Sequence, residues 1–158
     1  MMQKKFLVAI WLLQDLLQVL FLGFCLVPNL YLTYLLLITT LDFSNDELSS
    51  KALVYAFIGG VLYDLRWTNV PGASALSWCL ALTIASAIWG YMPQNVRHYI
   101  SYFLLVFFIL LFSELVHFVF FAVSSIVMLR QLLPNVVLTM IVAFISGVMF
   151  MRKQSSDF

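Results

Sequence analysis

The sequence contains few charged residues. Only 9% of its 158 residues are charged, as eight Lys or Arg and seven Asp or Glu, whereas 64% are hydrophobic. Soluble domains carry about 25% charged residues, so this chain has too few to coat a globule in water. Disorder is also excluded, because it requires low hydrophobicity and high charge. The net charge is +1 and no Lys/Arg cluster exceeds two residues, which predicts no nucleic-acid partner.

Cysteine and catalytic motifs are also scarce. Cys25 and Cys79 are the only cysteines, and both lie in apolar stretches. Two such residues define neither a disulfide framework nor a metal site. The chain has no H-E-x-x-H pattern, no G-x-S-x-G pattern and no phosphate-binding loop. We therefore expect no enzyme, no catalytic residue and no cofactor.

Long apolar runs are abundant instead. At about 20 residues per membrane span, the length allows five or six helices. Turn signals at Pro28-Asn29, Pro71-Gly72 and Gly90–Pro93 divide the runs. No small-residue cleavage site follows the first run, so we interpret it as a retained span rather than a signal peptide. We predict an all-α integral membrane protein, one polytopic domain over residues 1–158, with six transmembrane helices at 6–24, 28–43, 52–65, 73–89, 99–124 and 132–151.

The second and third segments are short for spans, so a re-entrant hairpin is the alternative. Its tip would carry Asp42, Asp46, Glu47 and Lys51 into hydrocarbon, at roughly 2.5–3.5 kcal/mol per charge. Two complete but slightly short helices are therefore favoured.

The Lys and Arg positions predict the orientation. Six spans place both termini on one side, together with six basic residues, and leave only Arg66 and Arg130 on the other side. Cytoplasmic loops carry the excess of Lys and Arg, so both termini are expected in the cytoplasm. The six basic residues on that side are Lys4, Lys5, Lys51, Arg97, Arg152 and Lys153.

Two predicted spans contain titratable residues at depth. Asp15 lies near the middle of the first span, beside the face that Gln14 and Gln18 share. Intramembrane carboxylates are a functional hypothesis by default, but a protonated acid bonded between helices, or a partner-helix contact, is the favoured reading over transport. The reason is that no predicted span contains a Lys or Arg that would neutralise Asp15.

Glu114 and His117 share a face of the fifth span, because they are three residues apart. Glu-x-x-His is half of a di-iron signature, and that site needs two such motifs and two further glutamates. We therefore expect no metal site. Ser113 and His117 with a carboxylate could be combined into a hydrolase triad, but any apolar helical protein of this size would offer the same residue types, so we give this combination no weight.

Small residues repeat every four positions along the fourth predicted span, at Ala73, Ser77, Ala81 and Ala85. Such spacing allows another helix to approach closely. Gly59-Gly60 in the third span offers a similar notch, and Ala143 with Gly147 repeats it weakly in the sixth. We expect these positions to pack within the monomer first, and to dock another protein's helix second. A homodimer is left open.

Two segments stand out together: V-P-N-L-Y-L at residues 27–32, and G-G-V-L-Y-D-L at residues 59–65, followed by Gly72 and Leu76. A P-[DN]-apolar run, followed by a G-x-x-x-D-L run ahead of a glycine and an apolar helix, resembles the rod shape-determining protein MreD family. The basic start, the chain length and the six-span layout agree with this resemblance over nearly the whole sequence. The Asp that usually follows the family's proline is Asn29 here.

The resemblance implies a bacterial inner-membrane component of the cell-elongation machinery, a scaffold that helps to maintain rod shape and to position peptidoglycan synthesis. It implies an MreC-like single-span partner, with the MreB filament and peptidoglycan synthases more broadly, besides membrane lipid. It also implies a fold similar to the substrate-binding components of energy-coupling-factor transporters. That fold supplies the alternative function, a small-molecule, vitamin-like binding subunit of a transporter, while an intramembrane enzyme ranks third.

The predicted topology adds a hypothesis about the two motif segments. The second span begins, and the third ends, on the extracytoplasmic side, so Pro28 and Asn29 should lie near Tyr63 and Asp64. These residues, with Gly59 and Gly60, then form either a structural turn or a docking site for the partner's membrane-proximal segment. Pairing of Asp64 with Arg66, or capping of the turn by Asp64, is the structural alternative.

Overall fold

The computed structural model of this chain describes residues 4–20, 29–41, 46–67, 71–121 and 137–149. These residues are helical throughout, apart from short turns, so the all-α prediction is confirmed for them. The helices are α1 (Lys4–Leu20), α2 (Leu30–Leu41), α3 (Asp46–Trp67), α4 (Ala73–Tyr91), the short 3₁₀ helix η1 (Gln94–Val96), α5 (Tyr99–Phe121) and an apolar helix at Val137–Met149.

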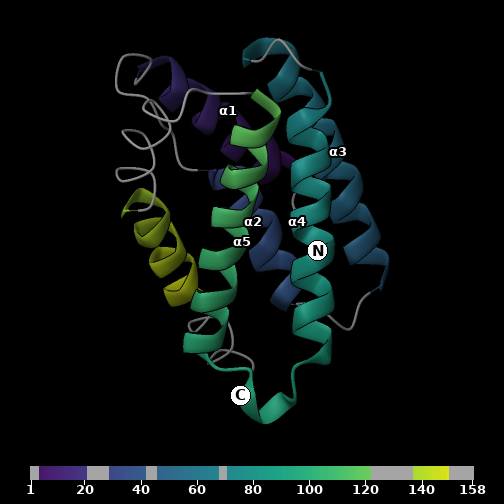
Figure 1. The fold of residues 1–158 in the computed structure, drawn as a ribbon, viewed down its shortest axis with the longest axis vertical. Coiled ribbons are helices and arrows are strands. Elements are labelled where there is room, and N and C mark those ends of the chain that lie inside the picture. The colour runs from purple at the N-terminus through teal and green to yellow at the C-terminus, as the bar shows by residue number, and fades with distance from the viewer. Residues whose placement is uncertain (1–3, 21–28, 42–45, 68–70, 122–136, 150–158) are drawn as a thin grey trace.

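The helices form one bundle around α2. α3, α4 and α5 run along the long axis of the molecule in alternating directions, and α1 is inclined across the end where α3 finishes (Figure 1). We name that end the Trp67 end, and the opposite end, where η1 joins α4 to α5, the Arg97 end. α2 contacts α1, α3, α4 and α5, which places this twelve-residue helix at the centre.

The composition of α2 explains its central position. Leu32, Leu35 and Leu36 have no exposed surface. The helix is apolar apart from its threonines and tyrosines, and Thr39 and Thr40 bond back to carbonyls of their own helix. Because every polar group of these threonines is used locally, α2 can be buried on most sides without the cost of an unpaired hydroxyl.

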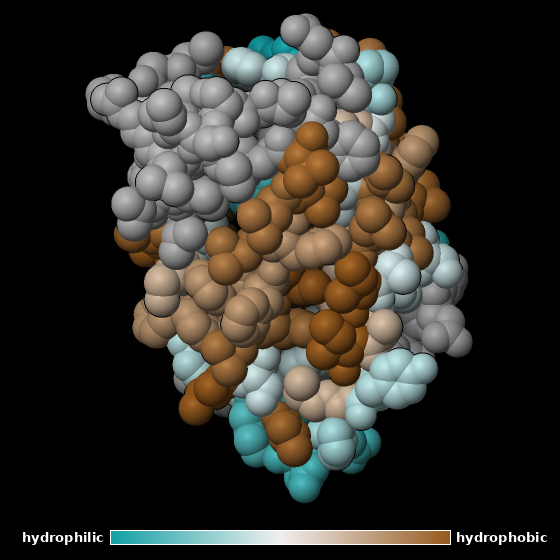
Figure 2. Space-filling view, in the orientation of Figure 1, coloured by the Kyte–Doolittle hydropathy of each residue, from teal (hydrophilic) through white to brown (hydrophobic). Residues whose placement is uncertain are grey.

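Two helices are long and apolar enough to cross a membrane, namely α4 over its 19 residues and the 18 residues Tyr99–Val116 of α5. α2 and Val137–Met149 are apolar but shorter. The surface of α4 and α5 is hydrophobic over the middle of the bundle and hydrophilic at the Arg97 end (Figure 2). An apolar band that ends in polar residues matches a helix that leaves hydrocarbon at that level. Six spans were expected, and the described residues establish only these two as candidates.

One helix boundary differs clearly from the prediction. α3 begins at Asp46, six residues before the expected start at residue 52. Asp46 and Glu47 belong to the first turn of this helix. The polar stretch therefore extends the helix instead of forming a loop. The resulting 22-residue α3 is roughly 33 Å long.

Small residues bring α3, α4 and α5 close together, although the residue of α4 that meets α3 most closely, Ala75, lies outside the four-residue repeat. A Cβ on Gly60 would lie 2.4 Å from the Cα of Ala75, so α3 meets the α4 backbone there. On the next face of α4, Ser77 Oγ lies 3.0 Å from Ser113 Oγ of α5. Ala73, Ser77, Ala81 and Ala85 are all buried. These positions are occupied by packing within the chain, which is the use the sequence favoured.

The turn between α3 and α4 depends on one glycine. Gly72 has φ +91° immediately before α4, a left-handed conformation that side chains with a Cβ rarely adopt. The turn reverses the chain within a few residues, so the start of α4 lies against the end of α3. This reversal is what brings Asp64 to the first turn of α4.

Candidate functional site

The polar residues of α1 form the first part of a cluster at the Trp67 end. Asp15 is 9% exposed. One carboxylate oxygen lies 2.7 Å from Arg66 Nη1, and the other accepts a hydrogen bond from Trp67 Nε1 at 2.9 Å. The inference that Asp15 lacks an internal cation was wrong. The inclined α1 brings the middle of its length to the end of α3, where the long Arg66 side chain reaches the carboxylate.

The two glutamines beside Asp15 connect α1 to different helices. Gln14 Oε1 accepts a hydrogen bond of 2.9 Å from the backbone N–H of Tyr31, in the first turn of α2. Gln18 Nε2 donates to the hydroxyl of Tyr63 in the last turns of α3. α1 thus holds the start of α2 and the end of α3 through side chains only four residues apart.

Asn29 and Asp64 both cap helices. Asn29 Oδ1 accepts a hydrogen bond from the N–H of Leu32 at 3.2 Å, which is the geometry of an N-cap for α2, and Asn serves as well as Asp in that role. Asp64 is 1% exposed, and its Oδ2 accepts a hydrogen bond from the N–H of Ser74 at 2.9 Å in the first turn of α4. Asp64 therefore fixes the turn, and a partner cannot reach its carboxylate. Pro28 lies outside the described residues.

Aromatic rings complete the link between the two motif segments. Tyr31 and Tyr63 both pack on Trp78 of α4, with ring centroids 5.7 and 5.6 Å apart. A Cβ on Gly59 would lie 2.5 Å from the Tyr31 ring, so glycine leaves the space that the ring fills. The structure thus links Tyr31 of the first motif segment to Gly59 directly and to Tyr63 through Trp78; the membrane side on which they lie stays a prediction.

The rim of this cluster differs from its interior. Leu65 is 71% exposed, and the Arg66 side chain is 52% exposed although it is paired with Asp15. We name Leu65 and Arg66 the rim pair. The motif suggests Asp64 as a contact residue, but the helix turns the next two residues, Leu65 and Arg66, outward instead. Leu65 belongs to the motif segment, but sequence analysis did not single it out as a contact residue.

Ser113 and Glu114 lie on α5, and Glu114 is close enough to Tyr63 of the cluster to interact with it electrostatically. The Ser113 hydroxyl is engaged with Ser77 between α5 and α4, which is a packing role. Glu114 is half-buried, and the side chain of His117 falls outside the description. Among the residues that the structure describes, no group of three His, Cys, Asp or Glu side chains is placed to hold a metal ion. For the remaining residues, the absence of a metal site stays a prediction.

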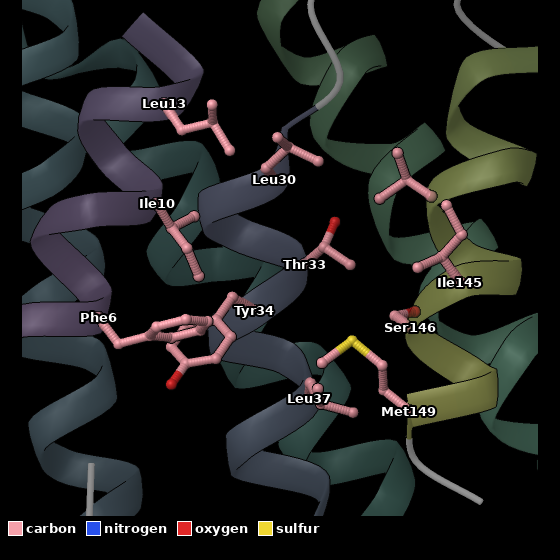
Figure 3. A pocket seen from close by; sticks show the side chains of 11 residues that line it. Phe6, Ile10, Leu13, Leu30, Thr33, Tyr34, Leu37, Ile145, Ser146 and Met149 are labelled. Atoms are coloured by element: carbon pink, nitrogen blue, oxygen red, sulfur yellow. The ribbon is translucent and has the colours of Figure 1, made fainter. Parts of the chain in front are cut away.

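An apolar groove of about 200 Å³ lies on another side of α2, between α1, α2 and the helix Val137–Met149 (Figure 3). Each helix contributes residues at i, i+3 or i+4, and i+7, the spacing of one helix face. Sequence analysis missed this groove because α2 and the helix Val137–Met149 are apolar on nearly every face, so no periodic pattern reveals which face is turned inward. The lining residues are Phe6, Ile10 and Leu13; Leu30, Thr33, Tyr34 and Leu37; and Val142, Ile145, Ser146 and Met149.

Neither a protein-family model, nor a curated protein, nor a solved structure matches this chain.

Proposed function

We propose that this protein is a non-enzymatic scaffold in the bacterial inner membrane, an MreD-like component of the cell-elongation machinery that binds an MreC-like single-span partner. The observation that carries the proposal is the junction of residues 29–31 with residues 59–64, the two segments on which the resemblance rests. They meet through Gln14, Gln18 and Trp78. The polar side chains of this junction are hydrogen-bonded within the chain. Such a junction holds the neighbouring surface residues in fixed positions, and its own side chains are not available for catalysis.

The proposed topology has six spans with both termini in the cytoplasm. The Arg97 end then faces the cytoplasm, in agreement with the excess of Lys and Arg predicted there. The Trp67 end faces outward, where the membrane-proximal segment of a single-span partner would emerge. In this arrangement the rim pair is the contact surface. Asp64 fixes its position, because the hydrogen bond from the Ser74 N–H holds the end of α3 against α4. Peptidoglycan synthases and the MreB filament are reached through that partner.

The alternative function, a vitamin-binding subunit of a transporter, calls for an enclosed pocket with polar side chains. The groove in the described residues is open and apolar, and Asp15 and Glu114 do not line it. Asp15 is instead engaged with Arg66 and Trp67. The geometry therefore favours the scaffold over the transporter subunit.

Capture of the partner tests this proposal. The full chain is used to capture a single-span protein with a periplasmic coiled coil, in wild type and as Leu65→Ala and Arg66→Ala. Both variants should reduce capture at least fivefold with little loss of stability, because both side chains are exposed. Leu12→Ala on α1 is the control, since it removes another exposed leucine, at 53% against 71% for Leu65, from a different helix. Undiminished capture by both rim variants would exclude the rim pair as the contact surface, and a tightly bound vitamin would favour the transporter subunit.

A further inference from the structure

The guanidinium of Arg66 is only partly engaged by the chain itself. Its Nη1 lies 2.7 Å from one carboxylate oxygen of Asp15, and 52% of the side chain is exposed. A guanidinium carries five N–H donors in a planar fork, and one carboxylate oxygen at Nη1 engages a minority of them. With half of the side chain open at the end of α3, a second acceptor can reach the group from outside.

The guanidinium is also held in position from two sides. Its Cζ lies 5.7 Å from the centroid of the Trp67 ring, and Trp67 Nε1 donates to the other oxygen of Asp15 at 2.9 Å. Asp15 is 9% exposed, so the helices around it fix its carboxylate. An exposed arginine normally loses rotamer freedom when it binds a partner, whereas Arg66 has already lost much of it within the chain.

The charges at this end of the molecule favour an anionic occupant. Asp15 and Asp64 are buried, and both are bonded inside the chain. Glu114 is half-buried and close enough to Tyr63 to interact with it. Arg66 is the most exposed charged side chain of the cluster. A partner that approaches the end of α3 therefore meets the cation first, with the acids behind it.

Leu65 favours a protein over a lipid headgroup as the occupant. Carboxylate and phosphate both match the guanidinium fork, but Leu65 is 71% exposed directly beside Arg66 in the sequence. A headgroup on Arg66 would leave this leucine among polar groups. A peptide segment with an acidic residue next to an apolar one covers both members of the rim pair and removes apolar surface from water.

We infer that the rim pair binds an Asp or Glu side chain in the membrane-proximal segment of the single-span partner. Arg66 bonds to Asp15 on its inner side and to the partner's carboxylate on its outer side, and an apolar neighbour of that acid packs on Leu65. Asp15 and Trp67 are positioning residues, because they act through the guanidinium that they orient. The inference rests on the proposed scaffold function, since it names the chemical group by which the partner is recognised.

Charge variants of Arg66 test the inference. Full-length wild type, Arg66→Lys and Arg66→Gln are placed in nanodiscs of phosphatidylcholine, and the Kd for the captured single-span protein is measured. Arg66→Lys keeps the charge but lacks the planar fork, so it should bind at least threefold more weakly, and Arg66→Gln at least tenfold more weakly. Lys51→Gln is the control, because it removes an exposed positive charge near the start of the same helix, and it should bind as wild type does.

Variants of the partner identify the carboxylate. Each Asp and Glu beside its span is changed in turn to the corresponding amide. One of these changes should weaken binding to wild type as much as Arg66→Gln does, and should add no further loss in the Arg66→Gln background, because contacting groups are not additive. Independent, additive losses at every acid would overturn the inference.

The positioning role of Asp15 has a separate readout. Asp15→Asn should weaken binding at least twofold when Arg66 is present and should have no effect in the Arg66→Gln background. An equal loss in both backgrounds would mean that Asp15 acts on the fold and not through the guanidinium, which contradicts the assignment.

The outcomes separate this inference from the proposed function. Capture that is lost in Leu65→Ala but unchanged in Arg66→Lys and Arg66→Gln would keep the scaffold and exclude the carboxylate. Weaker binding by Arg66→Gln in phosphatidylglycerol nanodiscs only would identify a lipid phosphate as the occupant and overturn the inference. Failure of wild type to capture any single-span protein would contradict the proposed function, and the inference with it.

Discussion

The bundle packs differently on the two sides of α2. On the side of α3, α4 and α5, small residues bring backbones together, as at Gly60 against Ala75. Polar side chains there are bonded between helices, as Ser77 is with Ser113. On the side of α1 and Val137–Met149, larger side chains meet at a distance and leave the apolar groove, and its hydroxyls bond within their own helices.

This contrast separates two kinds of apolar helix face. In a bilayer, lipid tails are as apolar as leucine, so helices associate through close packing and interhelical hydrogen bonds. The α3–α4–α5 side has both, and we expect it to account for most of the stability. On the groove side, Gln14 of α1 bonds to the start of α2, but the groove lining itself is apolar and open, so we expect this lining to accept changes more readily. The predictions below test this difference.

The largest effect is expected at Gly60. In Gly60→Ala the new Cβ meets the backbone of Ala75 at 2.4 Å, so α4 itself must move, at a cost of about 3 kcal/mol. Gly147→Ala is the matched control, because its Cβ meets the Tyr99 ring at 2.6 Å, and this half-exposed side chain can turn away. The control should lose less than about 1 kcal/mol, since Ala is also the better helix former.

Unfolding in a denaturing-detergent titration measures both variants. Trp78 and Trp89 are 3% and 2% exposed, so their fluorescence reports the loss of the packed side. Equal destabilisation by the two substitutions would show that α3 and α4 do not depend on backbone contact, and the contrast between the two sides would fail.

A smaller effect is expected at Asp64. Asp64→Ala leaves the N–H of Ser74 without its carboxylate acceptor in a buried turn, at a cost of about 1–3 kcal/mol. Asp64→Asn keeps an oxygen in place and should cost less than half as much. The same titration measures both. Partner capture by Asp64→Ala should fall only as far as the folded fraction falls; a complete loss of capture in a stable Asp64→Ala protein would restore Asp64 as a contact residue.

Sequence reasoning succeeded where one residue type controls the local backbone. Pro71-Gly72 and Gly90–Pro93 predicted the ends of α4 to within two residues, since a proline or a left-handed glycine interrupts a helix whatever surrounds it. The repeat at Ala73, Ser77, Ala81 and Ala85 predicted close packing for a similar reason. Small side chains at helical spacing permit few other uses.

Sequence reasoning failed where a contact depends on the tilt of a helix, and where a helix is so uniformly apolar that its buried face cannot be recognised. The Asp15–Arg66 contact joins residues 51 positions apart and depends on the inclination of α1, which no local pattern encodes. The groove is invisible for another reason. Val142, Ile145 and Met149 differ little in hydrophobicity from their neighbours on the other faces, so the sequence does not mark which ones turn inward. The six-span count also stays a prediction, because only α4 and part of α5 meet the length and apolarity of a span in the described residues.

The smallest effect is expected at the Asp15–Arg66 pair. A double-mutant cycle of Asp15→Asn and Arg66→Gln should give a coupling energy below about 1 kcal/mol, because the Arg66 side chain is 52% exposed and solvent screens the attraction. Asp15→Asn keeps an oxygen for Trp67, so it isolates the charge from the hydrogen bond that Trp67 Nε1 donates. The coupling should weaken further in high salt.

The size of that coupling also bears on how deep the Trp67 end lies. A value of several kcal/mol, unaffected by salt, would mean that the pair sits in hydrocarbon and that the rim is covered in the assembled protein. A value of zero would mean that solvent screens the pair completely. The expected intermediate value places Asp15 and Arg66 at the membrane boundary, where one partner is shielded by helices and the other remains open to a second protein.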